Sequence, residues 1–131
     1  MVRGCLRRNT AGRRREFAPV TAYAIAHMHN IHPGEGVGEY LGAIDATLAP
    51  FSGRFIVHGG RQRVVEGPVD GIVVVIEFPD FATVQRWYES SAYQDIVGLR
   101  AANTCSVAVL AERCASDHRA TDVLAEPDHY R

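Results

Sequence analysis

Apolar and polar residues follow regular patterns in the first half of the chain, and these patterns predict three elements. Residues 21–29, "TAYAIAHMH", alternate with a period of two, which is typical of a β-strand. Residues 35–49 carry apolar side chains at spacings of three and four, which indicates a helix with one apolar stripe that ends at Pro50. Alternation returns in "GRFIVHGG" (53–60) and predicts a second strand, which "RQRVV" can extend after a glycine bend or bulge.

Two more strands and a helical region are predicted after the turn-forming stretch "EGPVDG" (66–71). Residues 72–78, "IVVVIEF", are a nearly continuous β-branched run of the type that is buried on both faces, and residues 105–112, "CSVAVLAE", predict the last strand. Asp80 is a predicted N-cap of a helix whose apolar stripe comprises Phe81, Val84, Trp87 and Tyr88. A further helical stretch, "AYQDIVGLRAA" (92–102), places four residues within two turns: Tyr93, Ile96, Val97 and Arg100.

The order strand, helix, strand, strand, helix, strand predicts an α+β fold. Two βαβ-like halves joined by a hairpin form a ferredoxin-like sandwich, which has one antiparallel sheet and helices on one of its faces. The short chain leaves nothing to cover the other face of the sheet. We therefore expect a homodimer in which two sheets pack face to face as a dimeric α/β barrel.

The two ends of the chain lack such patterns, so we expect the domain to span residues 20–112. Residues 1–19 are rich in arginine and are expected to be a disordered leader, or a stretch preceding a true start near Val20. A basic arm for nucleic acid or a membrane surface is an alternative for this segment. Residues 113–131 are polar and are expected to form a frayed tail or a short added helix.

Composition limits the partners of this domain. All fourteen basic residues are arginine; six lie in the first nineteen positions beside one acid, and the remaining eight face fourteen acids. A body this acidic does not favour a nucleic-acid backbone, and no apolar run approaches the ~20 residues of a membrane-spanning helix. Three cysteines without a CxxC pair indicate neither a disulfide framework nor a zinc knuckle. We expect a cytoplasmic protein without nucleic-acid or membrane partners.

Three stretches of the chain resemble a bacterial family, domain of unknown function 1330, within the dimeric α/β-barrel superfamily. They are "SGRFIVHGG", "EGPVDGIVVVIEFPD" and "WYESSAYQDIVGLR", and the likeness covers about residues 21–112. The resemblance implies a ferredoxin-like fold and a homodimer whose sheets form a barrel, but no established reaction. The wider superfamily includes cofactor-free monooxygenases, heme-handling enzymes, lactone isomerases and stress-response proteins.

The chain departs from the family pattern at two positions. His58 stands where the family usually has arginine, and His27 or His29 stands where an acid is common. If an acid and an arginine pair in the family's pocket, both sides of that pair differ here. Site residues therefore have to be argued from this chain.

The histidines of "HMHNIHPGE" (27–35) raise the question of a metal site. His27 and His29 lie at i and i+2 on one strand face, as cupin-type metal ligands do, and Glu35 follows as that motif's acid would. Three ligands from His27, His29 and His58 are conceivable, with His32 as a replacement. The simpler interpretation is a hydrogen-bonded His27 and two solvated histidines, and no metal is expected.

The alternation of the second strand places Arg54 and His58 on one face, towards the dimer barrel. There a buried cation must be paired or bind an anion, which suits a small carboxylated or phenolic ligand, and His58 can move a proton near neutral pH. The simpler interpretation of Arg54 is a structural ion pair with Glu77 or Asp45. Glu77 interrupts an apolar strand and is a candidate base if it is desolvated. A structural pair with a neighbour such as Arg100 is the alternative explanation for Glu77.

Our candidate site therefore comprises His58 and Glu77 as catalytic residues and five residues as ligand contacts: Arg54, His27, Tyr23, Trp87 and Arg100. At their helical spacing Trp87, Tyr88 and Tyr93 also fit core packing. The sequence has no phosphate loop, dinucleotide fingerprint or nucleophile elbow, so no cofactor is expected. We expect a protein that binds or converts a small carboxylated or aromatic molecule, by cofactor-free oxygenation or isomerisation if it is an enzyme. A non-catalytic stress-response or accessory dimerisation domain is the alternative, and a histidine metal site is a second one.

Overall fold

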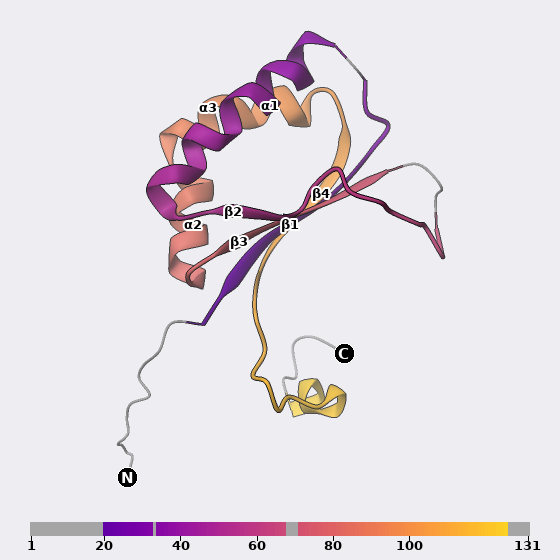
Figure 1. The fold of residues 1–131 in the computed structure, drawn as a ribbon, viewed down its shortest axis with the longest axis vertical. Helices are drawn as coiled ribbons and strands as arrows, with labels where there is room; N and C mark the ends of the chain where they lie inside the picture. The colour runs from indigo at the N-terminus through magenta and orange to yellow at the C-terminus, as the bar shows by residue number, and fades with distance from the viewer. Residues whose placement is uncertain (1–19, 33, 68–70, 126–131) are drawn as a thin grey trace.

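The computed structural model describes residues 20–32, 34–67 and 71–125. The expected leader (1–19) lies outside the described residues, as does the end of the expected tail (126–131). The elements follow the predicted order, with the second helical region divided into two helices (Figure 1). In chain order they are β1 (Ala22–His29), α1 (Glu35–Leu48), the 3-10 helix η2 (Ala49–Phe51), β2 (Arg54–Val57), β3 (Ile72–Phe78), α2 (Phe81–Glu89), α3 (Ser91–Ala101), β4 (Cys105–Glu112) and the 3-10 helix η3 (Ala120–Ala125).

The four strands form one antiparallel sheet in the order β2-β3-β1-β4. The central strand β1 pairs with β3 on one side and with β4 on the other, so that Ile25 lies between Val75 and Val109. All three α-helices lie on one side of this sheet (Figure 1). The α+β, ferredoxin-like prediction is confirmed.

Local side-chain caps determine where the second and third helices begin. Asp80 caps α2 as predicted, since its Oδ1 accepts a hydrogen bond from the Thr83 backbone N–H at 2.8 Å. Ser90 separates α2 from α3, and its Oγ accepts a hydrogen bond from the Tyr93 backbone N–H at 3.3 Å. These two caps turn the chain so that both helices cover the same face of the sheet.

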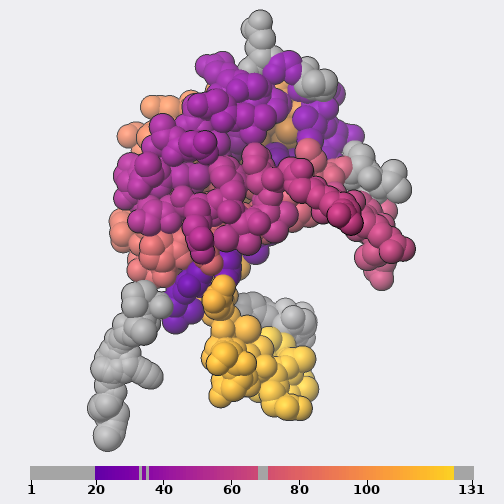
Figure 2. Space-filling view, in the orientation of Figure 1, coloured from indigo at the N-terminus to yellow at the C-terminus, as the bar shows by residue number. Residues whose placement is uncertain are grey.

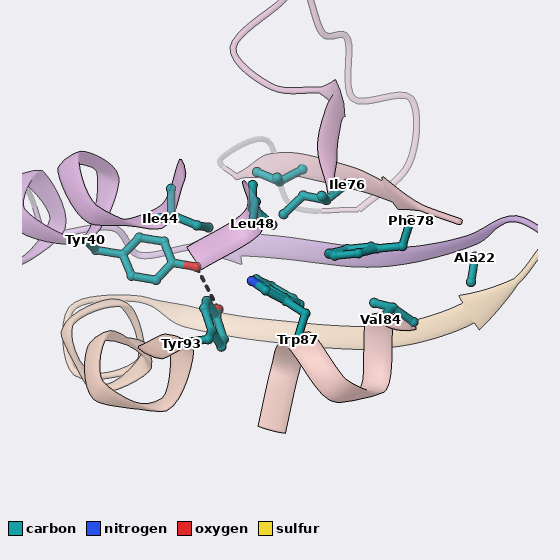
Figure 3. Close-up of a cluster of buried hydrophobic side chains, with 10 residues drawn as sticks. Ala22, Tyr40, Ile44, Leu48, Ile76, Phe78, Val84, Trp87 and Tyr93 are labelled. Atoms are coloured by element: carbon teal, nitrogen blue, oxygen red, sulfur yellow. Dashed lines mark hydrogen bonds between the residues drawn. The ribbon is translucent and has the colours of Figure 1, made fainter. Parts of the chain in front are cut away.

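The core lies between this sheet face and the helices. Trp87, Phe78 and Val84 are its largest fully buried side chains, and Figure 3 shows them with Tyr40, Tyr93 and the α1 residues that pack above the strands. The indole Nε1–H of Trp87 donates to Thr47 Oγ1 at 3.0 Å, so the polar atom of this buried ring is satisfied. Trp87 thus ties α2 to α1 across the core.

The other face of the sheet is open and apolar in the single chain. Its large exposed hydrophobic side chains come from β1, β2 and β4 and include Ile25, Val57, Val107 and Val109. In the single chain strand β3 is buried on one face only, because Val74, Ile76 and Phe78 are buried on the helix side, whereas the open-face residues between them are partly exposed. The single chain therefore leaves this face uncovered, as expected for a chain too short to cover both faces of its own sheet.

The C-terminal segment leaves the sheet after β4 and ends in η3. It is held to the sheet by the Arg113 backbone N–H, which donates to Thr21 O at 2.8 Å. In Figure 2 the residues of η3 stand apart from the body of the molecule. This 3-10 helix corresponds to the short added helix expected for the tail. In the described part of the chain, no helix is long and apolar enough to cross a membrane.

Strand β2 contains a bulge that changes the direction of its side chains. Phe55 pairs with Ile76, but the next pair joins Val57 to Val75, so Ile56 is an extra residue without a partner in the ladder. Arg54 and Val57 therefore lie on the open face, and Phe55 lies on the helix side. The strand ends at Val57, and the expected continuation through "RQRVV" is wrong because residues 61–65 form no strand.

Candidate functional site

A cavity of about 230 Å³ lies between the sheet and the helices. Strands contribute small or aliphatic side chains such as Ala24, Ala26 and Ile76, and the small residues leave room beneath the helices. The wall opposite is largely aromatic and comprises Tyr40, Trp87, Tyr88 and Tyr93. Figure 3 shows three of these residues, Tyr40, Trp87 and Tyr93. A mostly apolar space with a few polar groups at its wall is the usual form of a small-molecule site.

His58 lines this cavity, on the side of the sheet opposite to Arg54. Its ring stacks on Phe55 with 4.4 Å between centroids and 21° between planes, and the residue is exposed to solvent. The prediction that Arg54 and His58 share a face is wrong, because the bulge at Ile56 shifts the alternation by one residue. His58 therefore lies where solvent and cavity meet.

Two tyrosine hydroxyls meet at the cavity wall. The Tyr40 and Tyr93 hydroxyl oxygens are 2.7 Å apart and share a hydrogen bond, drawn as a dashed line in Figure 3. Burial raises the pKa of Tyr40, and its interactions with Tyr93 raise it further against the opposing effect of Arg100. The Tyr40 hydroxyl therefore stays neutral at physiological pH and can donate or accept a hydrogen bond.

Arg100 is the cation at this wall, and only 8% of it is exposed. Its Nη1 donates to Ser106 Oγ at 2.6 Å, and its Cζ lies 5.9 Å from the centroid of the Tyr40 ring. Burial alone lowers the pKa of Arg100, but its interactions with Tyr93 and Tyr40 outweigh this and raise it. Among the described residues no carboxylate forms an ion pair with Arg100.

A second polar cluster lies on the open face, at the start of β1 and the end of β3. Arg54 pairs with Glu77 through Nη2 and Oε1 at 2.7 Å, and Arg113 lies 3.7 Å from the other carboxylate oxygen. The Arg113 guanidinium also donates hydrogen bonds to the Tyr23 hydroxyl. The ion pair between Arg54 and Glu77 is thus present, and Glu77 and Tyr23 lie on the face away from the cavity.

The histidines of the first strand do not meet His58. His27 and His29 are neighbours on the open face, with ring centroids 5.4 Å apart, whereas His58 lies at the cavity. No group of three histidine, cysteine, aspartate or glutamate side chains within the described ranges is close enough to hold a metal ion. The alternative of a metal site made by His27, His29 and His58 is therefore wrong. His32 is exposed, and the side chain of Glu35 lies outside the description.

The structure thus divides the predicted site residues into two groups. His58, Trp87 and Arg100 line the cavity, while the others lie on the open face: Arg54, Glu77, Tyr23 and His27. Sequence reasoning missed Tyr40 and Phe55 as cavity residues, since their spacing indicated only core packing. The position of Arg100 on the same helical stripe as Tyr93 was the one visible sign that a charge faces the core.

Topology and sequence together define the class of this protein as a ferredoxin-like α+β domain. It belongs to the family described as Domain of unknown function (DUF1330), whose profile matches residues 21–114, so the resemblance is confirmed. No curated protein sequence matches the chain significantly.

Two solved structures are similar to this chain. A protein of unknown function from Rhodopseudomonas palustris is 15% identical over 73% of this chain and 84% of that chain, with a TM-score of 0.57. SnoaB, a cofactor-independent oxygenase from Streptomyces nogalater, is 16% identical over 76% of this chain and 99% of that chain, with a TM-score of 0.52. At such identities these structures establish a shared fold and leave the activity to be argued from the site.

Proposed function

We propose that this protein binds a small aromatic or carboxylated organic molecule in the cavity between its sheet and its helices. The observation that carries the proposal is the cavity of about 230 Å³, whose largely aromatic wall holds one buried cation, Arg100. An aromatic wall suits the faces of a flat ligand, and the few polar groups fix its orientation. Ligand contacts come from His58, Trp87 and Arg100, and Arg54 is not among them.

His58 is the residue most suited to handle a proton at this site. It is exposed and lines the cavity, and an imidazole can both accept and donate a proton. If the bound molecule is converted, cofactor-free oxygenation or isomerisation fits a site of aromatic, hydroxyl and imidazole groups. SnoaB, with a similar fold, is a cofactor-independent oxygenase, and this likeness favours the first reaction.

The protein is proposed to act as a homodimer through its open sheet face. Isolated domains rarely leave so many large apolar side chains from neighbouring strands exposed together. A two-fold dimer would cover Val107 and Val109 of each copy with the sheet of the other. A purely accessory dimerisation domain would need this face but not the cavity with its polar groups, so the cavity favours ligand binding.

The test is a thermal-shift screen of small carboxylic acids and phenols on the wild type and on His58→Ala. His118→Ala is the matched control, since His118 lies in the C-terminal segment beyond the cavity. A ligand that stabilises the wild type and the control, and stabilises His58→Ala less, supports the proposal. If no compound shifts the wild type, or if His58→Ala responds identically to every compound, the proposal is wrong.

A further inference from the structure

We infer that the cavity selects a monocarboxylate, whose carboxylate group pairs with Arg100 while its apolar or aromatic part lies against Trp87. This inference rests on the proposed function and names the class of ligand. It goes beyond binding in general because it predicts a charge preference and assigns that preference to one residue.

The arginines that the structure describes near the sheet differ in whether an acid balances their charge. On the open face, Arg54 and Arg113 share the Glu77 carboxylate. Arg100 is far more buried than either, yet within the described residues only neutral groups surround its guanidinium. A buried cation without a counter-ion is costly, so its retention indicates an anion that comes from outside the chain.

The tyrosines beside Arg100 cannot supply this anion. Burial raises the pKa of Tyr40, and its hydroxyl shares a hydrogen bond of 2.7 Å with Tyr93. Both hydroxyls can orient a ligand but do not neutralise the guanidinium. A ligand carboxylate would do so, and it could also accept a hydrogen bond from the one hydroxyl of this pair that does not donate to the other.

The geometry and charge of Arg100 also limit the shape and charge of the ligand. The hydrogen bond from Nη1 to Ser106 Oγ restrains the Arg100 guanidinium at the cavity wall before a ligand arrives. Guanidinium and carboxylate match each other with two parallel hydrogen bonds, which a point charge cannot reproduce. Arg100 is the one cationic arginine among the lining residues, so a single negative charge balances it and a dianion would not.

The test compares two probes of the same shape, 3-phenylpropanoate and 3-phenylpropanamide, by calorimetric titration of the full chain. A charge-assisted pair predicts that the wild type binds the carboxylate about tenfold or more tightly than the amide. This comparison needs no variant, so it stands even if a substitution at Arg100 fails to fold. Equal affinity for the two probes would overturn the inference and leave the proposed function standing, whereas no binding of either would contradict both.

The variant Arg100→Gln tests whether Arg100 causes the preference for the carboxylate over the amide. We expect this variant to bind the amide as the wild type does and to lose the preference for the carboxylate, and Arg100→Lys to keep a part of it. Arg86→Gln is the matched control, because Arg86 is exposed on α2 and does not line the cavity. A carboxylate preference that survives in Arg100→Gln would overturn the inference.

The melting temperature of the unliganded variant separates a binding role from a structural one. Removing an uncompensated buried charge should leave the melting temperature of Arg100→Gln unchanged or raise it, because function rather than stability retains such a group. A structural arginine would instead lower it. A lowered melting temperature together with an intact carboxylate preference would assign Arg100 to the scaffold.

Discussion

The two faces of the sheet treat charge in opposite ways. On the open face, which is solvated in the single chain, Arg54 and Glu77 form an ion pair, and the Arg54 side chain is 72% exposed. On the covered face, Arg100 is buried among hydroxyl and aromatic groups with no acid beside it in the described chain. We propose that the compensated cluster serves structure or association and that the uncompensated cation belongs to a binding site.

On the covered face, side-chain packing should contribute most to the free energy of unfolding. Trp87 is only 2% exposed and joins α2 to α1 through Thr47, so Trp87→Ala leaves a large void and removes a buried hydrogen bond. We expect the free energy of unfolding to fall by about 3–5 kcal/mol, measured by chemical denaturation. A loss below about 1 kcal/mol would mean that this part of the core is not packed as the structure shows.

A substitution on the open face should weaken dimerisation and leave the fold of the single chain intact. Val107 is 61% exposed in the single chain, so Val107→Asp should leave the fold intact and disrupt the dimer by placing one charge per copy in the interface. Sedimentation velocity should show the dimer dissociation constant raised about a hundredfold or more. Gln85→Asp on the exposed side of α2 is the control, and equal dissociation constants for the two variants would contradict the proposed interface.

The neutral tyrosine on the covered face should appear in the alkaline pH dependence of stability. Because burial holds the folded-state pKa of Tyr40 above its ordinary value of 10.0, its contribution to stability is complete below pH 10 and is lost at higher pH. By pH 11 this loss should reach about 1 kcal/mol in the wild type and be absent in Tyr40→Phe. Identical alkaline slopes of the unfolding free energy would show that Tyr40 is not shielded.

The ion pair on the open face should contribute least. Since Arg54 is 72% exposed, solvent screens its attraction to Glu77, and Arg54→Gln should change the free energy of unfolding by less than about 1 kcal/mol. The same variant should bind ligands as the wild type does. Loss of ligand binding in Arg54→Gln would indicate that the ligand binds at the open face and would contradict a site at the covered face.

Most of the fold could be predicted from the sequence because its strands and helices carry consistent periods. The strand from 72 to 78, the last strand and the Asp80 cap were predicted at or within a residue of their positions. The bulge at Ile56 could not be predicted, because "RFIVHGG" alternates as well with it as without it. That one extra residue separates Arg54 from His58 and moves the candidate site to the other face.

The site was predictable only where a charge broke an apolar pattern. Arg100 shares a helical stripe with Tyr93, and this irregularity does mark the cavity. Glu77 breaks a strand pattern in the same way, yet it marks an ion pair at the open face. The difference depends on which face each residue occupies and on its partners, and both are set by tertiary packing.

The most direct test of ligand binding at the covered face uses Trp87, the single tryptophan of the chain, as a fluorescent reporter. Because this indole lines the cavity, titration of the wild type with 3-phenylpropanoate should change its emission saturably, with the midpoint that calorimetry gives. Val107→Asp, altered on the open face, should show the same change. Calorimetric binding without any change in Trp87 emission would place the ligand outside the cavity and contradict the proposed site.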